Sequence, residues 1–372
     1  MMTRGWPHRV EWEYMSDSGV LVHMARLRSI AGACVVFALA LSAACGGASG
    51  GGTSTGPTGS TGPNLPPGTP SGPFVFRASP IAVDAIRVIT PLGNLNPPDH
   101  TVPTDHIYFY VAIPDAGESP AARRTAFVAP ADGTVTSLYT SSGTTDVKVV
   151  VRATTTVSYY LDHLIPEISL VPGTKVTAGQ RLGTSGAAYA VDLGVMNDTV
   201  RLMGFVNPSR YPPDTLQAEA PLKYFEEPLR SQLYAKVQRI GPDLDGKIDF
   251  DIPGRLSGNW FGQGDNIPLA FAYDTFDPGQ VRIAVAGLPR SGFYISLVFA
   301  IAAGDPFPRD VSVASGKVRY TLTNSRTGPP LGGTPSTRLL VQMLDEGRIR
   351  AEGFLYPSTA DDFTSAAKTY VR

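Results

Sequence analysis

Residues 129–135 read APADGTV, and residues 170–183 read LVPGTKVTAGQRLG. In both stretches short apolar runs end at glycine, which tight turns between strands require because it has no Cβ. Val135, Val176 and Leu182 stand where the side chains of short strands would point into a small β core. The two stretches therefore predict antiparallel strands joined by tight turns.

The rest of the chain continues this pattern. It has 39 Gly and 33 Pro among 372 residues, and only 17% of its residues are charged, which favours a β-rich protein over a helical bundle. The expected strands are 83–89, 106–113, 125–129, 134–139, 147–152, 156–161 and 190–195, and then 247–252, 269–273, 281–285, 294–300, 317–323, 338–344 and 348–354. A short helix is expected within 216–235. The fold class is therefore all-β, with a β-sandwich or barrel domain followed by a second antiparallel β domain.

The charges nearly cancel, since 31 Lys and Arg face 32 Asp and Glu. Proteins that bind nucleic acids need clustered cations, so this balance argues against a nucleic-acid partner. At about 150 residues per domain, the length predicts about two domains. We place the first at 74–215 and the second at 216–372.

The N-terminal residues have the pattern of an export signal. From Met24 the sequence reads MARLRSIAGACVVFALALSAACGG, in which two arginines precede an apolar core at 30–41 that is short for a membrane span. The ending LSAAC resembles a bacterial lipobox, which implies that Cys45 receives lipid. Ordinary signal cleavage with an incidental Cys45 is the alternative. Residues 1–44 would then be an upstream segment and a lipoprotein signal peptide.

Residues 46–73 consist almost entirely of Gly, Ser, Thr and Pro and carry no charge. Such a segment buries too little apolar surface to offset its ordering entropy, so we expect a disordered tether after Cys45. The two features together predict an exported protein held on the bacterial cell envelope by a lipid anchor. Gly46 stands where an aspartate would signal inner-membrane retention, which favours the outer membrane or the cell surface.

Three motifs together resemble the lysostaphin/LytM-type zinc metallopeptidase domain, a peptidoglycan endopeptidase family. That family runs ApxDGxV, then YxHL, then VxxGxxVxxGQxIG. This chain has residues 129–135, the sequence YLDHL at 160–164, and residues 170–183 in the same order. The resemblance covers about residues 75–210. It implies a small β fold, a zinc ion and peptidoglycan as the substrate or partner.

The resemblance also assigns roles to single residues. In the family, zinc is held by the His and Asp of an HxxxD motif and by the second His of a late HxH, while the His of YxHL and the first His of HxH flank the attacking water. His163 fills the YxHL position and is the candidate catalytic residue, with Tyr160 three residues before it where the family has two. In place of HxH the chain has Ala190 and Asp192. Asp192 could still ligate zinc, but Ala190 cannot act as a base or donor.

The first ligand motif has no unique match. His100, Asp105 and His106 all lie in the segment where HxxxD belongs. A strand starting at Asp105 places His106 in phase with Tyr108, which makes His106 the first choice as a zinc ligand and His100 or Asp105 the second. The alternative is that these are turn residues that cap strands. Zinc bonds are about 2 Å long, so this ligand set fails if His106 and Asp192 lie more than about 10 Å apart.

Three functions follow from these features. The first is a non-catalytic, peptidase-like domain of a lipid-anchored protein that binds or regulates at peptidoglycan, or binds another envelope protein. The second is an active zinc metalloendopeptidase that cleaves peptide cross-links of the cell wall. The third is a ligand-binding lipoprotein that acts through its C-terminal β domain. There Gly258-Asn-Trp260 resembles the GxW start of lipocalin-like barrels, although a Trp on the floor of any small β-barrel gives the same pattern.

Overall fold

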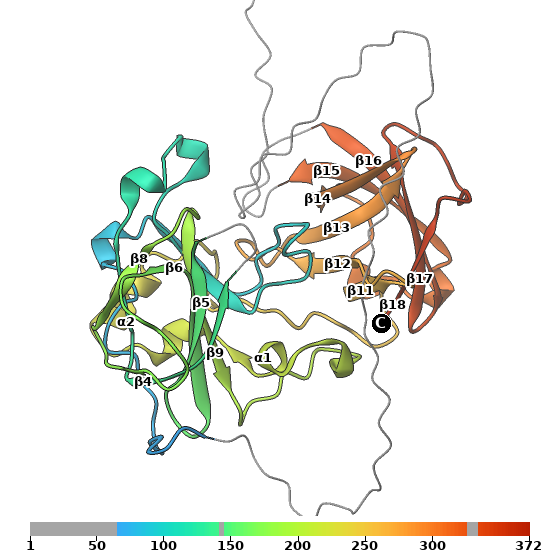
Figure 1. The fold of residues 1–372 in the computed structure, drawn as a ribbon. Helices are drawn as coiled ribbons and strands as arrows, with labels where there is room; N and C mark the ends of the chain where they lie inside the picture. The colour runs from blue at the N-terminus through green and yellow to red at the C-terminus, as the bar shows by residue number, and fades with distance from the viewer. Residues whose placement is uncertain (1–64, 141–144, 326–333) are drawn as a thin grey trace, which may run out of the picture. The chain divides into compact units, whose positions relative to one another are not determined.

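The structure is a computed structural model that describes residues 65–140, 145–325 and 334–372. The expected signal peptide, Cys45 and most of the expected tether lie outside these residues. Residues 66–372 form one compact unit. This unit is nearly all β, as the sequence predicts, and contains an antiparallel sheet and a closed barrel (Figure 1). Within the described ranges, no helix has the length and apolar character to cross a membrane.

The sheet has ten strands, and its centre joins segments that are distant in sequence. The strands are β1 (Val88–Thr90), β2 (His106–Tyr110), β3 (Ala126–Val128), β4 (Gly133–Thr140), β5 (Val147–Arg152), β6 (Val157–Pro166), β7 (Lys175–Val176), β8 (Arg181–Ser185), β9 (Ala190–Asn197) and β10 (Ala218–Glu219). They run in the order β1-β2-β9-β6-β5-β4-β7, while β10 pairs with β9, and β8 pairs with β3 and β6. As a result, β9 lies between β2 and β6.

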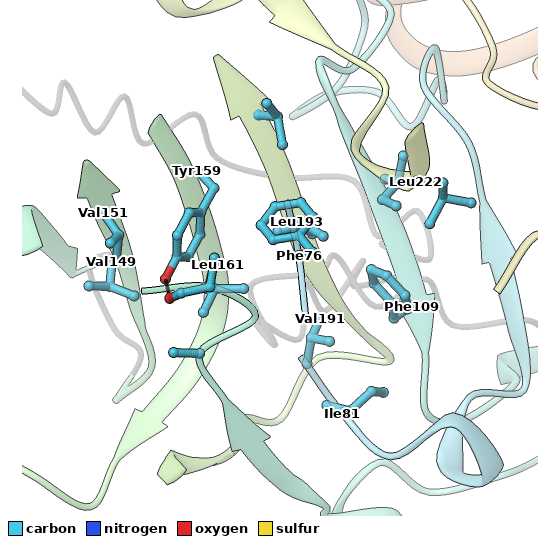
Figure 2. Close-up of a cluster of buried hydrophobic side chains, with 14 of the residues drawn as sticks. Phe76, Ile81, Phe109, Val149, Val151, Tyr159, Leu161, Val191, Leu193 and Leu222 are labelled. Carbon is cyan, nitrogen blue, oxygen red and sulfur yellow. Dashed lines mark hydrogen bonds between the residues drawn. The ribbon is translucent and has the colours of Figure 1, made fainter. Parts of the chain in front are cut away.

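Alternation along the central strands gives the sheet one apolar face and one polar face. The apolar face contributes to a buried core that includes Phe76, Ile81, Phe109, Val149, Val151, Tyr159, Leu161, Val191, Leu193 and Leu222 (Figure 2). Successive side chains of a strand point to opposite faces, so the residues between these core positions project from the other face. His106, Tyr160 and Asp192 are among them. The sheet thus separates the core from the residues that the sequence singles out for chemistry.

The helical segments of the described residues are short. They are the 3₁₀ turns η1 (Val83–Ala85), η2 (Pro114–Ala116), η3 (Ala121–Arg123), η4 (Pro208–Arg210), η5 (Pro221–Tyr224), η6 (Pro308–Asp310) and η7 (Val313–Ser315) and the helices α1 (Pro213–Leu216) and α2 (Leu229–Tyr234). The short helix expected within 216–235 is α2, which begins directly after Pro228, and the 3₁₀ turn η5 precedes it. Buried side chains from both sides of the predicted domain boundary at 215/216 contribute to the core of the sheet.

Three strand predictions need correction. The strand expected at 83–89 is only β1, since η1 occupies its first half. The strand expected at 247–252 is wrong: the carboxylates of Asp249 and Asp251 in this segment accept hydrogen bonds from the backbone N–H groups of Gly204 (2.8 Å) and Val206 (2.9 Å). Side-chain carboxylates thus accept the hydrogen bonds that backbone carbonyls of a neighbouring strand would otherwise accept. Third, the prediction omits the strands at 218–219, 258–262 and 368–371.

The second half of the described chain is a closed barrel of eight consecutive strands. They are β11 (Gly258–Gly262), β12 (Pro268–Tyr273), β13 (Val281–Arg290), β14 (Phe293–Ile301), β15 (Lys317–Ser325), β16 (Pro335–Asp345), β17 (Arg348–Leu355) and β18 (Lys368–Val371). Each strand pairs antiparallel with the next, and β18 closes the barrel on β11. The second antiparallel β domain that the sequence predicts is therefore present, and it is a closed barrel.

One end of the barrel is packed around Trp260, which is completely buried. The indole N–H donates to the carbonyl of Leu256 (2.8 Å), and the guanidinium carbon of Arg372 lies 3.9 Å from the centre of the Trp260 rings. Arg372 also donates to the carbonyls of Ile252 (3.1 Å) and Ser257. The last residue of the chain thus anchors the segment that enters the first strand of the barrel.

Candidate functional site

The polar face of the sheet brings together three of the residues that the sequence singles out. Nε2 of His106 lies 3.4 Å from Oδ2 of Asp192, and Nε2 of His163 lies 3.6 Å from the same oxygen. They come from three adjacent strands, β2, β9 and β6. The distance condition that the sequence sets for His106 and Asp192 is therefore met.

The backbone of β6 directs His163 toward this centre. The strand pairs with β9 as far as Asp162 and with β8 from Leu164 onward, so His163 lies where it changes partner. At this point His163 has φ of 64°, in the left-handed region that costs a non-glycine residue about 1 kcal/mol or more. Strain of this kind persists only where neighbouring contacts fix it. Here the Gly186 N–H donates to the His163 carbonyl (2.7 Å).

Each of the two histidines is held by a second carboxylate. Nδ1–H of His106 donates to Oδ1 of Asp105 (3.1 Å), and Nδ1–H of His163 donates to Oδ2 of Asp146 (3.1 Å). A proton on Nδ1 leaves Nε2 of each ring directed at Asp192. Second carboxylates that fix a ring in this way are typical of orienting groups around a functional centre.

Asp105 is itself fixed by hydroxyl groups. The Tyr160 phenol donates to Oδ1 (2.9 Å), and the Thr215 hydroxyl donates to Oδ2 (2.7 Å). The Tyr160 ring reaches Asp105 by crossing over Gly194, where a Cβ would lie 2.1 Å from the ring. Glycine at 194 therefore makes room for Tyr160.

The carboxylates determine which histidines are protonated. Burial alone lowers the pKa of His163, but Asp192 and the hydrogen bond to Asp146 outweigh burial and raise this pKa to about 10. For His106, too, burial is outweighed by Asp192 and Asp105, so its pKa is raised. Burial tends to raise the pKa of Asp105, but the hydrogen bond from His106 and the other contacts hold it below its usual range. In the metal-free protein the carboxylates therefore favour the protonated form of both imidazoles.

His100 and Ala190 lie beside the group formed by His106, Asp192 and His163 and are not part of it. The His100 ring centre lies 5.4 Å from that of His106, and burial, with the nearby His106 charge second, lowers the pKa of His100 to about 3. It is thus a neutral neighbour of the centre. Ala190 is buried at the start of β9, two residues before Asp192 and on the same face.

The donor set fits a zinc ion in part. A tetrahedral zinc with bonds of about 2.0–2.1 Å separates its ligand atoms by about 3.3–3.4 Å. The 3.4 and 3.6 Å separations around Asp192 match that spacing, and Nε2 of His106 is buried without a hydrogen bond. However, nowhere in the described residues do three or more His, Cys, Asp or Glu side chains form a ready metal-binding group. In the present arrangement Asp192 forms ion pairs with the two histidines.

The centre is nearly closed to solvent. The side chains of His106 and Asp192 are 10% and 6% exposed, and that of His163 is 25% exposed. A surface hollow of about 250 Å³ has its own lining residues, which are Asp198, Thr199, Val200, Arg201, Pro213, Leu216 and Gln217. No residue of the histidine–aspartate centre lines this hollow, so we do not assign it to the same site.

Sequence reasoning missed three members of this centre. Asp146 carries no motif, and it meets His163 only because β5 and β6 form a hairpin with an irregular register near Val147. Tyr160 was noted for its spacing, but its bond to Asp105 depends on the empty space at Gly194. Thr215 lies 110 residues from Asp105, and no local pattern identifies such a contact.

Comparisons with known proteins were made for the whole chain. No protein-family model matches it, and the search of curated proteins gives no match. Among solved structures, the NMR solution structure of lysostaphin is 12% identical, with 79% of this chain and 91% of that chain covered and a TM-score of 0.28. A chain of the SpoIIQ-SpoIIIAH pore forming complex is 13% identical, with 43% and 96% covered and a TM-score of 0.28.

A further similar structure is Helicobacter pylori Csd3, at 16% identity and a TM-score of 0.25. The match covers 34% of this chain and only 32% of the Csd3 chain. At such low identities and scores these likenesses carry no argument about activity. The function has to be judged from the residues of the centre.

Proposed function

We propose that this chain is a lipid-anchored protein of the bacterial cell envelope whose sheet domain is a non-catalytic relative of the LytM-type peptidases. In this proposal the domain binds or regulates at peptidoglycan and does not cut it. Cys45 would carry the lipid, and residues 46–73 would link the folded unit to the membrane. The motifs at 129–135, 160–164 and 170–183 support the choice of family.

The observation that carries the non-catalytic part is the closed centre with an alanine at 190. Metal-assisted hydrolysis needs a reacting carbonyl within about 3 Å of both the nucleophile and the group that stabilises the oxyanion. Here the Asp192 carboxylate lies between His106 and His163, and its side chain is only 6% exposed. Ala190 supplies neither a base nor a hydrogen-bond donor. A peptide bond thus lacks both access and one catalytic partner.

A zinc-dependent endopeptidase is the second candidate, favoured by the tetrahedral spacing around Asp192. In that case His106, Asp192 and His163 would hold the ion, with Asp105 and Asp146 orienting the two rings. Zinc would supply Lewis acidity toward a peptide carbonyl. His163 would then be a ligand, so the proton transfers expected of a catalytic histidine would need another group. The need for another proton-transfer group makes the zinc endopeptidase the weaker candidate.

Zinc stoichiometry of residues 66–372 separates the two candidates. The endopeptidase requires about one tightly bound zinc per chain, lost in His106→Ala and kept in the control His100→Ala, whose ring lies beside His106. It also requires soluble peptides to be released from purified peptidoglycan. We expect neither result, because the buried Asp192 carboxylate lies between the two imidazoles and Ala190 leaves the catalytic set incomplete.

Co-sedimentation with insoluble peptidoglycan tests the binding function. We expect residues 66–372 to appear in the pellet without release of soluble fragments. Protein that remains in the supernatant would remove peptidoglycan as the partner and leave another envelope protein as the alternative. Lipid attachment is tested separately, since labelled fatty acid should enter the full chain and be lost in Cys45→Ala.

A further inference from the structure

The end of the barrel that carries the β13–β14 hairpin exposes a group of apolar side chains, here called the rim patch. It consists of Phe293, Tyr294, Leu355 and Tyr356, which are 68%, 78%, 48% and 40% exposed. Phe293 and Tyr294 begin β14, and Leu355 and Tyr356 follow one another at the end of β17 (Figure 1). Single exposed apolar residues are ordinary, but four on two neighbouring strand ends of one barrel indicate an interaction surface.

The backbone beneath the rim patch is rigid. Ser291 and Gly292 both have positive φ, 46° and 87°, as a two-residue hairpin turn of the primed type requires. The Leu355 N–H donates to the Ser291 hydroxyl (3.1 Å), and Arg290 pairs with Gly353. These bonds tie the two tips together, so the four side chains lie on one fixed end of the barrel.

Two arginines border the rim patch without an acidic partner within 4 Å among the described residues. Arg290 donates to the Thr337 hydroxyl (2.9 Å), and the Arg338 guanidinium lies 5.2 Å from the centre of the Tyr356 ring. The carboxylate of Asp305 acts on Arg338 only at longer range. The border of the patch is thus suited to anionic groups.

Exposed Phe, Tyr and Leu with arginine beside them are the composition of a membrane-interface contact. Aromatic rings favour the headgroup level of a bilayer, and arginine favours anionic phosphates. Under the proposed function a lipid on Cys45 precedes Leu65 by 20 residues. A flexible chain of that length spans about 25 Å on average, so the folded unit would stay close to the bilayer surface.

We propose that the rim patch docks on the surface of an anionic phospholipid bilayer, with Phe293 and Tyr294 as the inserting side chains. The choice of a bilayer as the partner rests on the lipid anchor of the proposed function. The exposed residues of the rim patch belong to the barrel and do not depend on that proposal. Docking would hold this end of the barrel on the membrane to which Cys45 is attached.

The test uses residues 66–372, which lack Cys45, and sedimentation with vesicles of equal parts phosphatidylglycerol and phosphatidylcholine. The double variant Phe293→Ser, Tyr294→Ser should lower the partition coefficient about tenfold or more, since each aromatic side chain contributes through apolar burial. The control Tyr139→Ser removes a ring of β4 that is 59% exposed and should bind like the wild type. Vesicles of phosphatidylcholine alone should bind less.

Several results would overturn docking on a bilayer. They are wild-type protein that stays in the supernatant, a double variant with unchanged thermal unfolding that binds as well as the wild type, and equal loss in Tyr139→Ser. Loss of peptidoglycan retention in the double variant without vesicle binding would assign the rim patch to glycan instead. Failure of lipid labelling at Cys45 would reject the anchor but leave the vesicle result intact, so the two proposals can fail separately.

Discussion

Replacing Asp192 by Asn should destabilise the sheet domain by an amount that depends on pH. In the metal-free protein Asp192 faces two imidazoles at 3.4 and 3.6 Å and helps to raise the pKa of His163 from 6.5 to about 10. A shift of 3.5 units multiplied by about 1.36 kcal/mol per unit gives a ceiling of about 5 kcal/mol. The His163 side chain is a quarter exposed, so we expect a loss of about 2–3 kcal/mol near pH 6.

The sign of the pH dependence follows from proton linkage. A histidine with a raised pKa binds its proton more tightly in the folded state, so its stabilisation is complete below pH 6.5 and disappears as the pH rises through 10. His106, whose pKa is also raised, acts in the same direction. The difference in unfolding free energy between the wild type and Asp192→Asn should therefore shrink from pH 6 to pH 10.

Urea unfolding of residues 66–372 in EDTA at several pH values provides the assay. Trp260 is the only tryptophan of these residues, so its fluorescence reports unfolding of the barrel. A change in circular dichroism that does not coincide with the fluorescence transition reports unfolding of the sheet domain. Asp198→Asn is the matched control, since Asp198 pairs with Arg152 (2.9 Å) and arginine does not titrate below pH 12. A loss in Asp192→Asn that is constant from pH 6 to 10, as in the control, would refute the protonated-histidine centre.

Two further substitutions test packing. Arg372→Ala should destabilise the barrel by about 2–4 kcal/mol, seen as an earlier Trp260 fluorescence transition, because it removes backbone hydrogen bonds and the contact with the indole. The exposed control Arg348→Ala should change stability by less than about 0.5 kcal/mol, and equal effects would contradict the anchor. Gly194→Ala should cost about 1–3 kcal/mol by displacing the Tyr160 ring, measured by circular dichroism, and the double variant Gly194→Ala, Tyr160→Ala should be less affected than the sum of the two single variants.

The strands that the sequence predicts best are those with clear alternation. The strand expected at 147–152 has the bounds of β5, and the one expected at 190–195 is most of β9. The failure at 247–252 has a physical cause, since apolar and acidic residues alternate there as in a strand. Its aspartates bind loop N–H groups instead, and alternation alone does not reveal which partner a backbone segment finds.

The candidate centre was predictable where it depended on regular side-chain alternation along the strands and not where it depended on irregular backbone geometry. His106 and Asp192 lie on the same face because β2 and β9 pair in register, with His106 opposite Gly194. His163 and Asp146 meet because of a positive φ at His163 and an irregular pairing beside Val147. Such details arise from tertiary contacts, which are not encoded in the local pattern.

The carboxylate at 192 changes what the centre requires to remain folded. A neutral imidazole at this position would give His106 and His163 no opposite charge. A metal ion would then be the usual partner for the three imidazole nitrogens. A carboxylate forms ion pairs with His106 and His163 as soon as each of them takes up a proton. Protons can thus stabilise the centre in place of a metal, while Asp105 and Asp146 keep both rings oriented.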